Sequence, residues 1–232
     1  MRRTLRSFWL CFGVACTAQS AFADVKAGVA ALEAGDVEAA AKEFQTSFDA
    51  GDADGAFYLG RMFEMGLGTV VNIPQAVALF EASADKGSAL AINRLGLMYL
   101  DGQGVIRDYQ KGAELVCQAA DMGEQNAQFN CGAVLADGKG VAKDQAKALE
   151  YWRLASDQGQ IAASNLLALA YKTADGVDAD PAQAFGLFSK TAEQGNPMGL
   201  YEIALAYDAG SGTEKDLVKA FLRKHSRCPS AP

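Results

Sequence analysis

Apolar residues recur along this chain at two distances, a helical one within short segments and a 36-residue one over the whole chain. Residues 89–124 show the i, i+3, i+4, i+7 spacing of a buried helix face, at Ile92, Leu95, Gly96 and Tyr99. The same spacing returns one period before and after, and five units align without a gap: 53–88, 89–124, 125–160, 161–196 and 197–232. The pattern therefore predicts a tandem helical repeat.

Glycine and polar positions divide each unit into two helices, here called helix A and helix B. In four of the five units a glycine pair follows the first apolar stripe, as at Gly102 and Gly104, and in every unit an Asn or Asp such as Asp108 stands where helix B would begin. Glycine suits the left-handed residue that ends a helix, and Asp or Asn suits the N-cap of the next one. Each unit is therefore predicted to be a helix hairpin.

Stacked hairpins predict an all-α solenoid, because one hairpin alone cannot bury both of its apolar stripes. Residues 24–52 contain two expected helices, Val25 to Ala34 and Asp36 to Ala50, joined without a glycine-pair loop. An atypical first unit is typical of a capping hairpin. In the last unit, Arg223 and Lys224 replace apolar residues of the other units, which predicts a polar outer face and a truncated final repeat.

The repeat resembles the Sel1-like repeat, a relative of the tetratricopeptide repeat. The resemblance rests on Leu95 to Val105 followed by Asp108, and on Gly138 to Val141 followed by Asp144. It covers residues 53 to about 224, with local departures such as Ala174 in place of the first loop glycine of the fourth unit. The resemblance implies a right-handed α-solenoid of antiparallel hairpins, a tetratricopeptide-like hairpin at 24–52, and binding of proteins on the concave face.

The first 23 residues read as a secretory signal peptide. Three arginines precede the apolar run Phe8 to Ala15, and Ala21-Phe22-Ala23 forms an A-x-A cleavage site. The run is shorter than the about 20 residues that a spanning helix needs. Cys16 offers a lipoprotein alternative, although Gly13 stands where a lipidation box has a larger aliphatic residue. We therefore expect cleavage after Ala23 and a periplasmic protein, with secretion into the medium as an alternative.

Charge and composition restrict the kinds of molecule that this protein can bind. The chain has 232 residues, half of them hydrophobic, and a formal net charge of −7, which becomes −10 once the three signal-peptide arginines are removed. So acidic a protein repels nucleic acid and anionic lipid headgroups, and no second apolar segment is long enough to span a membrane. A basic protein or peptide fits this charge better.

Three cysteines follow the signal peptide: Cys117, Cys131 and Cys228. Cys117 lies six residues before Gly123 and Cys131 eight after it, so antiparallel helices on either side of one turn would bring the two thiols close. The spacing thus allows a disulfide if the strict geometry is met. The alternative is a buried Cys131 that acts as a small apolar side chain. Cys228 would be the loose thiol.

Residue patterns for catalysis are missing. The chain contains no zinc-protease, nucleophile-elbow or P-loop motif, and its one histidine, His225, has no partner acid at a readable spacing. The glycine pairs follow helices and not strands, so they predict turns and not a phosphate loop. We therefore expect no enzyme activity, no metal and no cofactor.

The resemblance places the binding surface on helix A, at unit positions 5 and 9. Position 5 holds Phe57, Asn93, Phe129, Asn165 and Tyr201, and position 9 holds Arg61, Leu97, Ala133, Leu169 and Leu205. Aromatic, amide and aliphatic groups together would form an apolar groove with hydrogen-bonding points, suited to a peptide or helix. The alternative is that tight packing of the A helices makes these side chains additional core.

The resulting prediction is a periplasmic scaffold, adaptor or regulator that binds a partner protein through the concave face. Two other functions remain open at this point. One is a binder or hydrolase of β-lactams or cell-wall fragments, as resemblance to cysteine-rich Sel1-like proteins implies, although the cysteine-per-repeat pattern of that type is absent. The other is a secreted factor that engages host proteins.

Overall fold

Residues 25–225, the part of the chain that the computed structural model describes, form twelve α-helices and no strand. The first hairpin consists of α1 (Val25–Glu33) and α2 (Val37–Asp49). The A helices are α3 (Ala53–Met65), α5 (Ala89–Asp101), α7 (Gln125–Asp137), α9 (Ile161–Thr173) and α11 (Pro197–Ala209). The B helices are α4 (Ile73–Asp85), α6 (Tyr109–Asp121), α8 (Gln145–Asp157), α10 (Pro181–Glu193) and α12 (Leu217–His225).

The predicted all-α fold is confirmed. The predicted signal peptide, the lipoprotein alternative at Cys16 and the thiol of Cys228 lie outside these residues.

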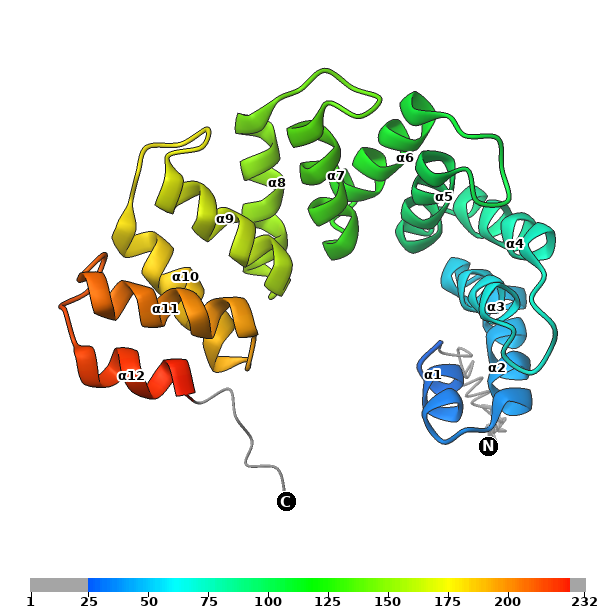
Figure 1. Cartoon of the computed structure of the whole chain (residues 1–232). Coiled ribbons are helices and arrows are strands. Elements are labelled where there is room, and N and C mark those ends of the chain that lie inside the picture. Colours follow the sequence, from blue (N-terminus) through cyan, green and yellow to red (C-terminus); the bar gives the residue numbers. More distant parts are fainter. Residues whose placement is uncertain (1–24, 226–232) are drawn as a thin grey trace, which may run out of the picture.

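The hairpins stack side by side along an open arc that runs from α1 to α12 (Figure 1). Each helix packs against the next one in the chain, which is the layout of an α-solenoid. In addition, α3 touches α5 and α5 touches α7, so neighbouring A helices approach one another directly. Helices on the inner side of a curved stack lie closer together than those on the outer side, so the A helices line the inner side of the arc.

Local sequence explains where the helices begin and end. Asp108 caps α6 by accepting a hydrogen bond from the backbone N–H of Lys111 at 3.0 Å, and its counterparts in the other units do the same for their B helices. Gly102 ends α5 in the left-handed conformation, with a φ of 72°. Ala174 ends α9 in that same conformation, with a φ of 58°, so the fourth loop keeps its shape without the glycine.

Small residues in the A helices let the two helices of a hairpin approach closely. A Cβ added at Gly132 would lie 2.4 Å from the indole nitrogen of Trp152, and one at Gly60 would lie 2.6 Å from the ring of Phe80. In the third unit the indole N–H of Trp152 also donates to the backbone oxygen of Phe129 at 3.2 Å. The bulky residue of helix B thus fills the space that the A-helix glycine leaves open, and this pairing recurs along the solenoid.

We predict that Gly96→Ala destabilises the fold although alanine favours helices. A Cβ at Gly96 would lie 2.9 Å from the backbone oxygen of Gly112 and 2.9 Å from the backbone nitrogen of Val116, so α5 and α6 must move apart. Overpacking of this kind costs about 1–3 kcal/mol. The measurement is the free energy of unfolding in urea.

Gly186→Ala is the matched control. Gly186 also lies inside a helix, α10, but a Cβ there would meet nothing within 4 Å. Replacing an exposed helical glycine by alanine stabilises by about 1 kcal/mol through backbone entropy. Equal effects of the two substitutions would contradict the close packing of α5 on α6.

The two ends of the solenoid differ. The first hairpin buries Phe44 completely, and Gly28 meets its ring as Gly60 meets that of Phe80. At the other end the expected polar outer face is wrong for most of α12, since Leu217, Val218, Phe221 and Leu222 are 59–70% exposed. The polar substitutions that prompted the expectation lie at neighbouring positions of the same helix, and they leave its outward face apolar.

Candidate partner-binding face

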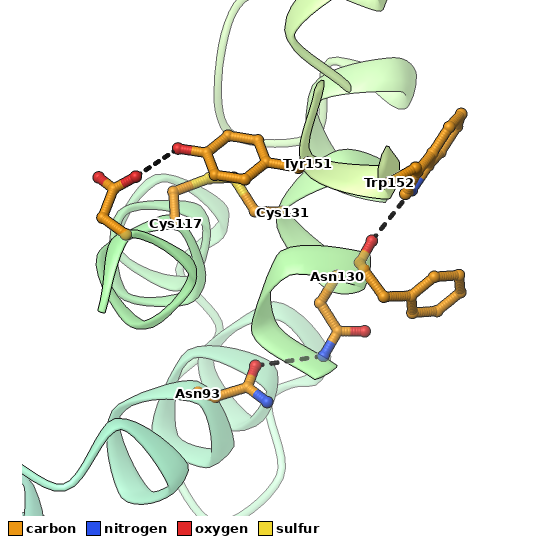
Figure 2. The surroundings of a disulfide bond; sticks show 8 residues. Asn93, Cys117, Asn130, Cys131, Tyr151 and Trp152 are labelled. Atoms are coloured by element: carbon orange, nitrogen blue, oxygen red, sulfur yellow. Dashed lines mark hydrogen bonds between the residues drawn. A yellow bond between two sulfur atoms is a disulfide. The ribbon is translucent and has the colours of Figure 1, made fainter. Parts of the chain in front are cut away.

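Polar side chains link consecutive A helices along the inner side of the arc. Arg94 of α5 pairs with Glu64 of α3, and Lys172 of α9 pairs with Glu202 of α11 at 2.6 Å. Between these pairs, the amide of Asn130 in α7 donates to the amide oxygen of Asn93 in α5 at 3.1 Å (Figure 2). Side-chain contacts therefore link α3 to α5, α5 to α7 and α9 to α11 along the inner side.

Two of the residues predicted to line an open groove are buried. Asn93 is 7% exposed and donates to Glu124 at 3.0 Å, while Asn165 is 6% exposed and donates to Asn196 at 3.1 Å. Both amides satisfy polar atoms at the joint between consecutive repeats, so the side chains are structural and do not face a partner. Here the sequence prediction is corrected, because neighbouring A helices lie too close to leave these two positions open.

The aromatic residues at the same unit position vary in exposure. Phe57 packs against Phe80 and Tyr58, with ring centroids 5.8 and 5.2 Å away, and so belongs mainly to the core. Phe129 is half-buried against the core around Trp152, whereas Tyr201 is 51% exposed. Tyr201 is thus the most accessible of the predicted residues at this position.

Unit position 9 is half-buried in every repeat, at Arg61, Leu97, Ala133, Leu169 and Leu205. Arg61 forms an ion pair with Glu64 one turn further along α3. Leu97 also contacts the core below it. Leu169 and Leu205 line hollows in the surface, and these two residues carry the predicted apolar character of the inner face most clearly.

The two hollows occupy corresponding places in successive repeats. One, of about 310 Å³, lies between α7 and α9 and is lined by Leu166, Leu169 and the indole of Trp152. The other, of about 230 Å³, lies between α9 and α11 and is lined by Leu205, Phe185 and Phe188. Since Trp152 and Phe188, and likewise Leu169 and Leu205, occupy the same positions of successive units, the inner face presents the same apolar notch twice.

The sequence prediction missed the walls of these notches. Neither Trp152 and Phe188 of helix B nor position 6 of helix A, which holds Leu166 and Glu202, was expected to face a partner. The sequence does contain a signal for these walls, namely the bulky residue that recurs in helix B opposite the small residue of helix A. The ring of such a residue is large enough to line a hollow beside helix A, as Trp152 and Phe188 do.

The structure contains the disulfide that the spacing allowed. Cys117 of α6 and Cys131 of α7 are joined with an S–S distance of 2.04 Å and a Cα–Cα distance of 4.9 Å, within the range that a disulfide requires (Figure 2). The bond connects helix B of the second repeat to helix A of the third. It therefore fastens two repeats to each other in the middle of the solenoid.

A second link crosses the same joint. The hydroxyl of Tyr151 in α8 donates to Asp121, the last residue of α6, at 2.6 Å (Figure 2). Burial, followed by this hydrogen bond and the negative charge of Asp121, raises the pKa of Tyr151 to about 12. The hydroxyl therefore stays protonated and donates to Asp121 throughout the physiological pH range.

The described residues contain no cluster of three or more His, Cys, Asp or Glu side chains that could hold a metal ion. None of the helices between residues 25 and 225 is long and apolar enough to cross a membrane.

A curved stack of hairpins with a notched inner face defines an α-solenoid of the kind that binds other proteins. The Sel1 repeat model matches residues 53–88, 89–124, 125–160, 161–196 and 197–222. The chain belongs to the Sel1 repeat family, so the resemblance found in the sequence is confirmed. Sel1 repeat proteins are generally scaffolds for protein interactions and mostly lack enzyme activity.

Solved structures of the same fold support this assignment. A Sel1 repeat protein from Oxalobacter formigenes is 26% identical, with a TM-score of 0.75 over 86% of this chain and 79% of that one. The protective antigen c5321 of uropathogenic Escherichia coli is 24% identical, with a TM-score of 0.73 over 86% of this chain. This chain spans only 47% of c5321. A Sel1 repeat protein from Klebsiella pneumoniae is 21% identical, with a TM-score of 0.51. The structures of c5321 and of the Klebsiella protein, both less than 25% identical, show the fold alone. Comparison with curated proteins gives no match.

Proposed function

We propose that this protein is a periplasmic scaffold or adaptor that binds a partner protein on the inner side of the solenoid. The observation that carries the proposal is the repeated notch, in which Leu169 above Trp152 and Leu205 above Phe188 form two equivalent apolar hollows in successive repeats. A partner that inserts one apolar side chain into each notch would displace water from both and gain affinity from both. Notches of this size suit side chains and not a whole folded domain.

The polar surroundings of the notches suit a peptide segment. The ion pair of Lys172 with Glu202 lies at the edge of the α9–α11 notch, with the lysine 43% exposed. Such a half-exposed pair can exchange partners with a backbone or charged side chain of a bound segment. The acidic character of the chain favours a segment that is basic outside its apolar anchors. The location follows from the signal peptide predicted at residues 1–23.

We predict that Leu169→Ser combined with Leu205→Ser weakens partner binding at least tenfold and leaves the helix content unchanged. Both side chains line the notches, so their loss removes apolar contact from the partner's anchors, each worth about 1–3 kcal/mol. The measurement is capture from an envelope extract with immobilised protein, quantified against competing free protein, together with far-UV circular dichroism.

The matched control is Leu154→Ser combined with Ile106→Ser. Leu154 lies on helix B and is 49% exposed, and Ile106 lies in a loop and is 91% exposed. This variant loses the same apolar mass from other surfaces and should retain the captured protein. If both double variants bind alike, the notches are not the binding site, and if neither wild type nor control captures a protein, the proposed function is wrong.

A further inference from the structure

The last helix of the solenoid exposes a broad apolar face. Leu217, Val218, Phe221 and Leu222 of α12 are all more than half exposed. Two of these positions are polar or small in the preceding B helices: Val218 corresponds to Pro74, Gln110, Ala146 and Ala182, and Leu222 corresponds to Ala78, Glu114, Glu150 and Gly186. An exposed apolar face of this width is therefore a feature of α12, and faces of this kind mark interaction sites.

The rest of the solenoid shows what covers this face. The counterpart of Leu217 in the first repeat is Ile73, whose side chain lies against Gly104 in the loop of the second repeat. The counterpart of Phe221 is Phe185, whose ring packs edge-on against Tyr207 of the fifth repeat with centroids 5.4 Å apart. Leu217 and Phe221 thus continue the interface between repeats, and an A helix with its loop is the element that fits them. Val218 and Leu222 extend this apolar face at positions that are exposed in the other B helices.

One A-type helix of this chain has its own matching face exposed. Gly28 meets Phe44 as Gly60 meets Phe80, so α1 aligns with α3 and its Ala27 and Ala30 correspond to Leu59 and Met62. In α3 those two residues pack with Phe44 of the preceding helix α2. In α1 they are exposed, and no described residue precedes the helix. The small side chains leave room for the bulky ones of α12.

Charge favours contact between unlike ends. Helix α12 contains Lys219, Arg223 and Lys224 and no acidic residue, whereas residues 25–52 contain six acidic residues and two lysines. Opposite charges at the two ends attract, while two α12 helices would repel each other. We propose that copies of this chain associate head to tail, with α12 of one copy packed against α1 of the next. Such heterologous contacts build open chains unless the rotation closes a ring.

Two variants test the proposal. Leu217→Ser with Phe221→Ser blocks the tail, and Ala27→Lys with Ala30→Lys blocks the head by bulk and by repulsion from α12. The full chain is expressed, purified and studied by sedimentation velocity over a concentration series at low and high salt.

Wild type is expected to form species larger than a dimer, and the association between copies is expected to weaken with salt. Each variant alone is expected to be monomeric, and an equimolar mixture to form a dimer and nothing larger, because only one intact joint remains. Leu154→Ser, an exposed apolar loss on α8, is the control and should behave as wild type.

Three results would overturn the proposal. Wild type that stays monomeric at its highest soluble concentration shows that α12 does not bind a second copy. A head variant that still dimerises by itself shows contact between two α12 helices. Monomeric wild type that binds vesicles of anionic phospholipid, with loss of binding in the tail variant, shows that α12 serves a membrane surface. None of these outcomes affects the notches of the inner face, so the proposed function is tested separately.

Discussion

Trp152→Ala is expected to lower the free energy of unfolding by about 3–5 kcal/mol, the largest single-residue effect that we predict. The side chain is 6% exposed, fills the space over Gly132 and donates to the backbone oxygen of Phe129, so its removal leaves both a cavity and an acceptor without its donor. It also forms a wall of one inner-face notch. The measurement is urea unfolding followed by far-UV circular dichroism.

Trp152→Phe is the control for this prediction. The first and fourth repeats carry phenylalanine at the same position, as Phe80 and Phe188, and fold into the same hairpin. The ring remains while the indole N–H is lost, so we expect at most about 1.5 kcal/mol of destabilisation. A loss as large as that of the alanine variant would show that the hydrogen bond, and not the packing over Gly132, holds the hairpin together.

Removal of the disulfide is expected to cost about 3 kcal/mol. The bond between Cys117 and Cys131 closes a loop with a sequence separation of 14, and cross-linking such a loop lowers the entropy of the unfolded chain by about that amount. The double substitution Cys117→Ala with Cys131→Ala keeps small apolar groups at both sites. The double variant is expected to unfold at the same urea concentration as wild type whose disulfide has been opened by a reductant.

The reductant itself supplies the control. It should shift the midpoint of wild type and leave that of the double alanine variant unchanged, with thiol alkylation and mass spectrometry showing the state of both cysteines. Free thiols in protein purified without reductant would contradict the disulfide. An unchanged midpoint after proven reduction would mean that packing between α6 and α7 alone holds the second and third repeats together.

Most of the fold could be predicted because the same sequence signals for the start and end of a helix recur in five units. Asp108 and its counterparts cap helices and Gly102 and its counterparts end them, so a helix boundary that is ambiguous in one unit is fixed by the others. The two cysteines lie at similar distances on either side of Gly123, so their spacing along the chain already allowed the disulfide that the structure contains.

The binding face was harder to predict because exposure depends on how closely consecutive repeats stack. The resemblance placed Asn93 and Asn165 on an open inner face, whereas both side chains are buried. The distance between neighbouring A helices decides whether such a side chain is open or buried, and no short-range pattern encodes that distance. The apolar face of α12 was missed for a related reason. Arg223 and Lys224 indicated a polar cap, yet which side of a terminal helix stays uncovered depends on the helix it packs against.

The most direct test of the central claim is a site-specific photo-crosslink from within the solenoid. A photoreactive amino acid is placed in living cells either at Leu169, in an inner-face notch, or at Leu154, exposed on helix B of the preceding repeat. If a partner binds on the inner side, irradiation yields a discrete protein adduct from position 169 and none from position 154. A discrete adduct from 154 alone, or from neither position, would contradict binding on the inner face.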